Sequence, residues 1–181
     1  MGEGPNSHGN FVLDDTLHQI AKETQLSRPL RVESPMGEGR FDDYMYFCFS
    51  YLFVMNDVDK AIALLTKFKD QGIQPSVYTY TILVKGLCRS GKLEDAQKVF
   101  EDLLVKGYNL DVYAYTVMIQ GFCDKDLFDE ALALLSKMEE NGCIPDAKTY
   151  EIIILSLFEK DENDMAEKLL REMILRGFFK D

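Results

Sequence analysis

The sequence predicts an all-α fold, an α-α superhelix (solenoid) of helix-turn-helix repeats. Two observations and one packing argument support this prediction. A shift of 35 residues aligns the 181-residue chain with itself, bringing together Ala61, Ala96, Ala131 and Ala166, and also Gly72, Gly107, Gly142 and Gly177. Apolar residues recur three and four positions apart within each unit, as on one face of a helix. A single unit of this kind cannot bury both apolar faces, so neighbouring units must stack.

The alignment divides the chain into five segments. Residues 1–41 lack the period and contain several glycines and prolines, which predicts a flexible or irregular N-terminal leader. Residues 42–76 match the pattern only in their second half and are interpreted as a degenerate repeat. Three fuller repeats follow at residues 77–111, 112–146 and 147–181.

Each repeat is expected to contain two helices, and the second repeat shows why. Its apolar spacing predicts helices over 77–89 and 93–106, separated by a tight turn at Ser90-Gly91. Gly107 follows the second helix, where a left-handed C-cap favours glycine. The aligned alanines are expected where helices approach closely, and Tyr80, Tyr115 and Tyr150 are expected in the core.

Composition argues against several other classes of protein. The four cysteines form no CxxC pair and the two histidines lie outside the repeats, so neither a metal site nor a cofactor is expected. The longest apolar run, at residues 44–55, is much shorter than the roughly 20 residues of a membrane span. No catalytic constellation, glycine-rich phosphate loop or nucleophile elbow is visible, so the chain is not expected to be an enzyme.

Two stretches of the sequence resemble a known family. They are VYTYTILVKGLCRSGKLEDAQKVFEDLLVKG and VYAYTVMIQGFCDKDLFDEALALLSKMEENGCIPD, and they look like pentatricopeptide repeats of the plant type. The resemblance covers about residues 42–181, and the 35-residue period differs from the 34 residues of the related tetratricopeptide repeats. It implies the subclass of uniform repeats, whose members bind single-stranded RNA in mitochondria or chloroplasts and affect its processing, stability or translation.

The resemblance also implies which residues contact RNA. In the family, the first helices line a concave groove, where the fifth and last residues of a repeat read one base and the second residue flanks it. In this sequence the base-reading residues are Thr81, Asp111, Thr116 and Asp146, and the base-flanking residues are Tyr78 and Tyr113. Threonine paired with aspartate accompanies guanine in the family. Lys85 and Arg89 are candidate phosphate contacts.

These residues also have simpler interpretations. Asp111 and Asp146 precede helices, where aspartate is an ordinary N-cap, and one residue can serve both roles. The two threonines can be helix-surface residues, and Lys85 and Arg89 can be solvated charges. The first and last repeats depart from the pattern, so no base is assigned to either.

The predicted affinity is low. Two reading repeats at about 1–3 kcal/mol per base give roughly 2–6 kcal/mol, near the value for a millimolar dissociation constant. Recognition is therefore expected to need a longer array, a protein partner or self-association through exposed terminal repeats. A net charge of −11 opposes general nucleic-acid binding, so a protein-binding scaffold and a degenerate fragment without activity remain alternatives. The leader does not resemble an import signal, which leaves a cytoplasmic location open beside the organelles.

Overall fold

The computed structural model describes residues 48–49, 52–53, 57–70, 72 and 74–178. By its contacts the chain separates into two units, Met1–Asp43 and Tyr44–Asp181, and the described residues all belong to the second. The predicted leader, residues 1–41, lies outside the described residues. The helices of the described part are α3 (Val58–Asp70), α4 (Val77–Arg89), α5 (Leu93–Val105), α6 (Val112–Cys123), α7 (Phe128–Glu140), α8 (Ala147–Glu159) and α9 (Asn163–Leu175).

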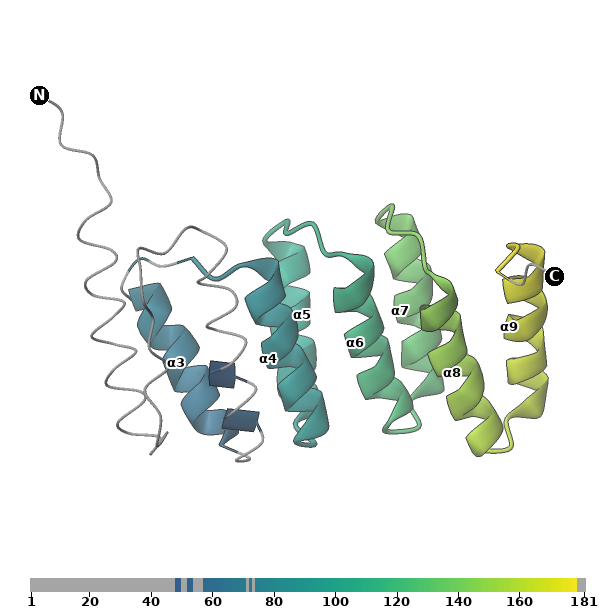
Figure 1. Ribbon diagram of the computed structural model, residues 1–181, viewed down its shortest axis with the longest axis horizontal. Coiled ribbons are helices and arrows are strands. Elements are labelled where there is room, and N and C mark those ends of the chain that lie inside the picture. The colour runs from purple at the N-terminus through teal and green to yellow at the C-terminus, as the bar shows by residue number, and fades with distance from the viewer. Residues whose placement is uncertain (1–47, 50–51, 54–56, 71, 73, 179–181) are drawn as a thin grey trace, which may run out of the picture. The chain divides into compact units, whose positions relative to one another are not determined.

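The helices from α4 onward form three antiparallel hairpins, which stand beside one another along the chain (Figure 1). Within each hairpin, α4 packs on α5, α6 on α7, and α8 on α9. Between hairpins, α4 packs on α6 and α6 on α8, so the first helices form one continuous layer, here called the first-helix layer. The predicted all-α repeat solenoid is confirmed by this stacking.

The last residue of each repeat caps the first helix of the next. Ser76 Oγ, Asp111 Oδ1 and Asp146 Oδ1 accept hydrogen bonds from the backbone N–H of Thr79, Ala114 and Thr149, at 3.2, 2.8 and 2.9 Å. Each bond satisfies a helix N–H group that has no partner inside the helix, and a cap of this kind contributes about 1 kcal/mol. The predicted capping role of Asp111 and Asp146 is confirmed.

Left-handed backbone conformations mark two kinds of turn. The predicted left-handed C-cap is confirmed at Gly107, with φ of 75°, and α5 ends at Val105, one residue before the predicted Lys106. In the turn inside the hairpins, Gly91 has φ of 75°, while the equivalent positions hold Asp126 and Asp161 at 60° and 61°. Aspartate tolerates this region better than most residues because its short polar side chain bonds locally.

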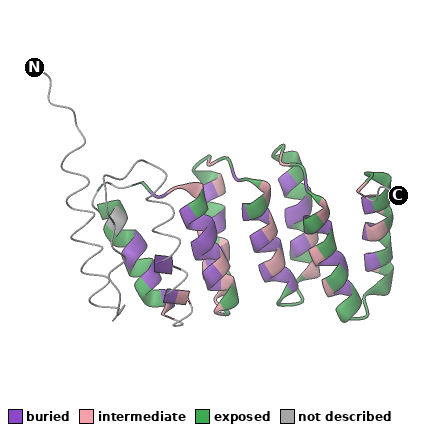
Figure 2. Cartoon of the chain, in the orientation of Figure 1, coloured by how far each residue is buried: buried purple, intermediate pink, exposed green. Residues whose placement is uncertain are grey.

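Buried residues recur along each helix (Figure 2), and many of them share positions in the 35-residue alignment. The four aligned alanines are all 0% exposed, which confirms that they lie where helices meet. The aligned tyrosines are buried as predicted, and the ring of Tyr115 meets that of Phe100 edge to face at 5.3 Å. The hydroxyl groups of Tyr115 and Tyr150 remain hydrogen-bonded: Asn141 Nδ2 donates to the first at 2.7 Å, and the second donates to Glu172 at 3.0 Å.

Glycines allow the close approach of neighbouring first helices. A Cβ atom at Gly121 would lie 2.5 Å from Cys88 Sγ, and one at Gly86 would lie 2.1 Å from ring carbons of Phe53. Both glycines occupy the same column of the 35-residue alignment. They therefore let the preceding hairpin pack directly against the backbone of α4 and α6.

Within the part of the chain described, none of the helices is long and apolar enough to cross a membrane.

Candidate nucleic-acid interface

A recess opens on the first-helix layer. It has a volume of about 280 Å³ and takes side chains from α4, α6 and α8, so three consecutive repeats build it. Its lining residues are Lys85, Cys88, Arg89, Tyr113, Thr116, Val117, Gln120, Gly121, Asp124, Lys148 and Ile152. A groove that crosses successive repeats is the geometry needed to hold an extended chain, with one part of the ligand against each repeat.

The recess has a local excess of positive charge in an acidic protein. Lys85, Arg89 and Lys148 line it with one carboxylate, Asp124, which accepts a hydrogen bond of 2.7 Å from Gln120 Nε2. Lys148 pairs with Glu151 at 2.9 Å on the surface, whereas Arg89 makes no ion pair within the described residues. An anionic ligand would therefore meet a guanidinium that no carboxylate of the described residues pairs with, despite the net charge of −11.

Tyr113 provides an exposed aromatic surface at the recess. The residue is 43% exposed, and its hydroxyl oxygen accepts a hydrogen bond of 3.0 Å from Lys85 Nζ. The same ammonium lies 5.5 Å from the ring centroid, within the range of a cation–π contact. Lys85 thus restrains a ring on which a planar ligand can stack. Tyr78 is equally exposed on α4, but it does not line the recess.

The two predicted reading threonines have different environments. Thr116 is half-buried, lines the recess and donates to Val112 O at 2.7 Å. Thr81 donates to Val77 O at 2.8 Å in the same way, but it is only 3% exposed and does not line the recess. The difference arises from what packs over each helix, because both threonines occupy the fifth position of a repeat.

Asp111 and Asp146 are exposed and do not line the recess. Each uses Oδ1 to cap a helix, and among the described residues neither Oδ2 accepts a hydrogen bond. The cap therefore occupies only one oxygen of each carboxylate. The recess brings together Lys85, Arg89, Tyr113 and Thr116; the other predicted residues, Tyr78, Thr81, Asp111 and Asp146, lie outside it. All eight assignments stay predictions.

Cys88 gives the recess a neutral surface. Burial, with a smaller effect from the Asp124 carboxylate, raises the pKa of its thiol from 9.0 to about 11, so the sulfur is protonated at neutral pH. Such a thiol is neither a good nucleophile nor a good metal ligand. Across the part of the chain that the structure describes, no group of histidine, cysteine, aspartate and glutamate is arranged to hold a metal ion.

Sequence reasoning did not foresee two contributions of α8 to the preceding repeat. Lys148, at the second position of the last repeat, joins the recess of the preceding repeat, and Thr149 contacts Thr116 at 2.9 Å. Both residues belong to α8, and both side chains adjoin residues of α6. The sequence could have indicated these contacts, because stacking places the start of one repeat beside the middle of the previous one.

Stacked two-helix units with a shared recess on their first helices define a helical-repeat protein of the α-solenoid class. Known families agree with the geometry: the PPR repeat family model matches residues 110–159, and PPR repeat models match residues 71–103 and 148–178. The chain belongs to the pentatricopeptide repeat family.

Individual relatives support the same assignment. A pentatricopeptide repeat-containing protein of Arabidopsis thaliana is 37% identical over 51 residues, which are 28% of this chain and 8% of that protein. The crystal structure of maize PPR10 in complex with an 18-nt psaJ RNA element is similar, with a TM-score of 0.71 and 23% identity over 92% of this chain and 23% of PPR10. The PPR domain of Arabidopsis thaliana protein-only RNase P 1, solved with tRNA, has a TM-score of 0.60 and 15% identity over 95% of this chain and 93% of that domain.

The two structural similarities show a shared fold. The chain spans less than a tenth of the Arabidopsis repeat protein and less than a quarter of PPR10.

Proposed function

We propose that this chain binds single-stranded RNA along its first-helix layer. The observation that carries the proposal is the recess formed by α4, α6 and α8, where cations, an exposed tyrosine and a threonine hydroxyl face one space. Membership of a family that includes PPR10, a protein crystallised in complex with RNA, supports the same reading.

The side chains of this surface are suited to different parts of an RNA strand. Lys85, Arg89 and Lys148 are suited to phosphate oxygens, and the ring of Tyr113 is suited to stacking on a base. Thr116 and the uncommitted oxygen of Asp146 offer hydrogen-bond acceptors to base edges. Two such acceptors suit a base with neighbouring N–H donors, which agrees with the guanine expected for a threonine–aspartate pair.

The affinity of this chain by itself is expected to be weak, near millimolar, for the energetic reason given above. A biological role in organellar RNA processing, stability or translation, in a mitochondrion or chloroplast, is proposed on family membership alone. Additional repeats, a partner or self-association would raise the affinity by adding contacts.

Two charge-matched double variants test the proposal. Lys85→Ala with Arg89→Ala removes two recess cations, while Lys98→Ala with Lys168→Ala removes two exposed cations from α5 and α9. Anisotropy of a labelled single-stranded RNA, titrated at several salt concentrations, gives the affinity and its salt slope. The recess variant should bind several-fold more weakly with a slope smaller by about 1.4, since each single-strand phosphate contact contributes about 0.7.

The control variant should resemble the wild type, because both double variants change the net charge equally. Equal losses in the two variants would show a general charge effect and contradict a specific interface.

A peptide-binding scaffold is the second candidate, favoured by the net charge of −11. In that case a lysine-rich peptide, and not RNA, would bind, and the recess variant would bind it at least as tightly as the wild type does.

A further inference from the structure

A buried hydroxyl group connects the two predicted reading residues of the third repeat. Thr149, the third residue of the following repeat, is 0% exposed. Its Oγ1 lies 2.9 Å from Asp146 Oδ1 and 2.9 Å from Thr116 Oγ1. Thr116 also contacts Val112 O at 2.7 Å. Two hydrogen-bonding contacts therefore connect the Asp146 carboxylate, through Thr149, to Thr116 at the recess, and a third continues from Thr116 to Val112 O.

The number of available protons determines which group is the donor in each of these hydrogen bonds. A carboxylate and a backbone carbonyl only accept hydrogen bonds, and each threonine hydroxyl supplies one proton. The Thr149 proton is donated to Asp146, so the contact between the hydroxyl groups has Thr116 as its donor. The Thr116 proton is then shared between Thr149 and Val112 O. Thr116 keeps no proton for a ligand in the recess and offers it only lone pairs.

The second repeat lacks this connection. Its residue equivalent to Thr149 is Ala114, which has no hydroxyl group. Among the described residues, Asp111 Oδ1 accepts only the backbone bond from Ala114, at 2.8 Å, and Thr81 donates only to Val77 O. The chain therefore contains one connected pair, Thr116 with Asp146, and one unconnected pair at equivalent positions.

We propose that Thr149 is a positioning residue for base recognition by the third repeat. It fixes Thr116 and Asp146 as paired acceptors, which select a base that presents neighbouring N–H donors. Thr149 itself is buried and does not touch the ligand. The inference rests on the proposed RNA-binding function and adds that recognition at the third repeat, unlike that at the second, depends on this hydroxyl.

The test uses the nucleoside inosine, whose base lacks the 2-amino donor group that guanosine has. Single-stranded UUGGUU, UUIGUU and UUGIUU are titrated into the full-length chain, and NMR shifts report each dissociation constant. For the wild type, inosine should weaken binding at the position read by the third repeat by about threefold to tenfold, the range of one hydrogen bond. Thr149→Val should abolish that penalty, and Thr149→Ser should retain it.

Ala114→Thr adds the equivalent hydroxyl group to the second repeat. It should increase the loss of affinity that inosine causes at the position read by that repeat. Thermal melting confirms that each variant is folded. A merely structural role would weaken binding to all three RNAs equally, and so leave their affinity ratios unchanged.

The possible failures are distinguishable. If the wild-type chain binds none of the RNAs, the proposed function fails and this inference fails with it. If it binds them but Thr149→Val keeps the wild-type inosine penalty, or folded Ala114→Thr gains none, the role of Thr149 is overturned and RNA binding stands.

Discussion

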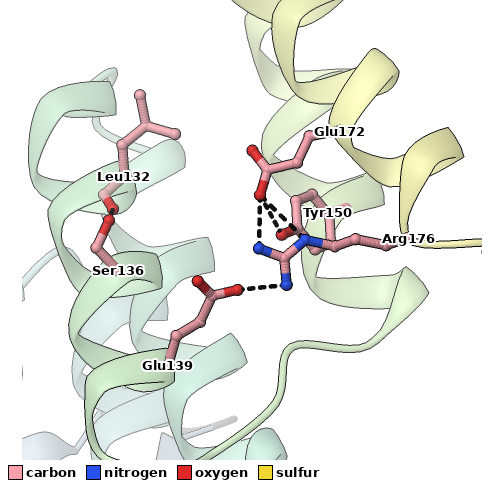
Figure 3. Close-up of polar contacts among 6 residues, drawn as sticks. All are labelled: Leu132, Ser136, Glu139, Tyr150, Glu172 and Arg176. Atoms are coloured by element: carbon pink, nitrogen blue, oxygen red, sulfur yellow. Dashed lines mark hydrogen bonds and ion pairs between the residues drawn. The ribbon is translucent and has the colours of Figure 1, made fainter.

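Arg176 and Glu139 form an ion pair between the last two hairpins, with Nη1 of the arginine 2.6 Å from Oε1 of the glutamate. Arg176 is the C-cap residue of α9 and Glu139 belongs to α7. The same guanidinium donates to Glu172 at 2.7 Å, and Glu172 accepts from the Tyr150 hydroxyl (Figure 3). One arginine thus connects α9 to the second helix of the previous repeat, although α7 and α9 do not otherwise pack together.

A double-mutant cycle on this pair should give a modest coupling energy. Arg176→Met and Glu139→Gln, made separately and together, should couple by about 0.5–1 kcal/mol, because both side chains are about one third exposed. Urea unfolding at low and high salt measures the free energies. The coupling should shrink in high salt; a coupling that is zero at low salt would mean that the pair does not stabilise the repeat interface.

A side chain at Gly121 should disrupt the stacking of α4 on α6. Gly121→Val places a branched side chain against Cys88 and should lower the free energy of unfolding by about 1–3 kcal/mol, the usual cost of overpacking. Urea unfolding measures this change. Cys88→Ala in the same chain removes the nearest atom and should recover part of the loss, so equal stability of the single and double variants would contradict the packing argument.

Much of the fold follows from the 35-residue alignment. The burial of Ala131 and Tyr115 could be predicted because a repeated small or aromatic residue has the same neighbours in every stacked unit. The cap at Asp111 could be predicted because it depends only on local sequence. The left-handed conformation of Asp126 was not foreseen, since the turn was inferred from the glycine at the equivalent position, Gly91.

The candidate site was less predictable than the fold. Thr81 and Thr116 occupy the same repeat position, yet one is buried and the other lines the recess. The period cannot distinguish them, because the difference lies in the neighbouring side chains. Likewise, the contact between Thr116 and Thr149 depends on the distance between α6 and α8, which no property of either helix alone determines.

Alkaline pH should destabilise the chain through two of its thiols, in half-buried Cys88 and buried Cys123. Burial is the main cause that raises the pKa of both Cys88 and Cys123 from 9.0 to about 11. Above pH 9 the unfolded chain releases these protons first, so the stability that the two thiols contribute is constant below pH 9 and falls as the pH rises from 9 to 11. Urea unfolding between pH 7 and about 10 measures this fall.

The matched variant carries Cys88→Ala and Cys123→Ala. It should be less stable at neutral pH, because one half-buried and one buried side chain are shortened, and its stability should change less between pH 8 and 10. An unchanged slope would show that other groups cause the alkaline effect.

The two roles assigned to Asp111 should be separable. Asp111→Asn keeps a side-chain oxygen that can cap α6, whereas Asp111→Ala loses the cap and should lower the free energy of unfolding by about 1 kcal/mol. Both variants remove the carboxylate, so both should weaken the preference for guanosine over inosine. Urea unfolding and NMR titration measure the two effects; a guanosine preference that is retained in Asp111→Asn would argue against a reading role for the carboxylate.

The most direct test of RNA binding by the first-helix layer is an NMR titration of the ¹⁵N-labelled chain with UUGGUU RNA. Backbone amide shifts should change chiefly in α4, α6 and α8, around Tyr113 and Thr116, as the RNA reaches millimolar concentration. Shifts confined to α5, α7 and α9, or no shifts at that concentration, would contradict the account.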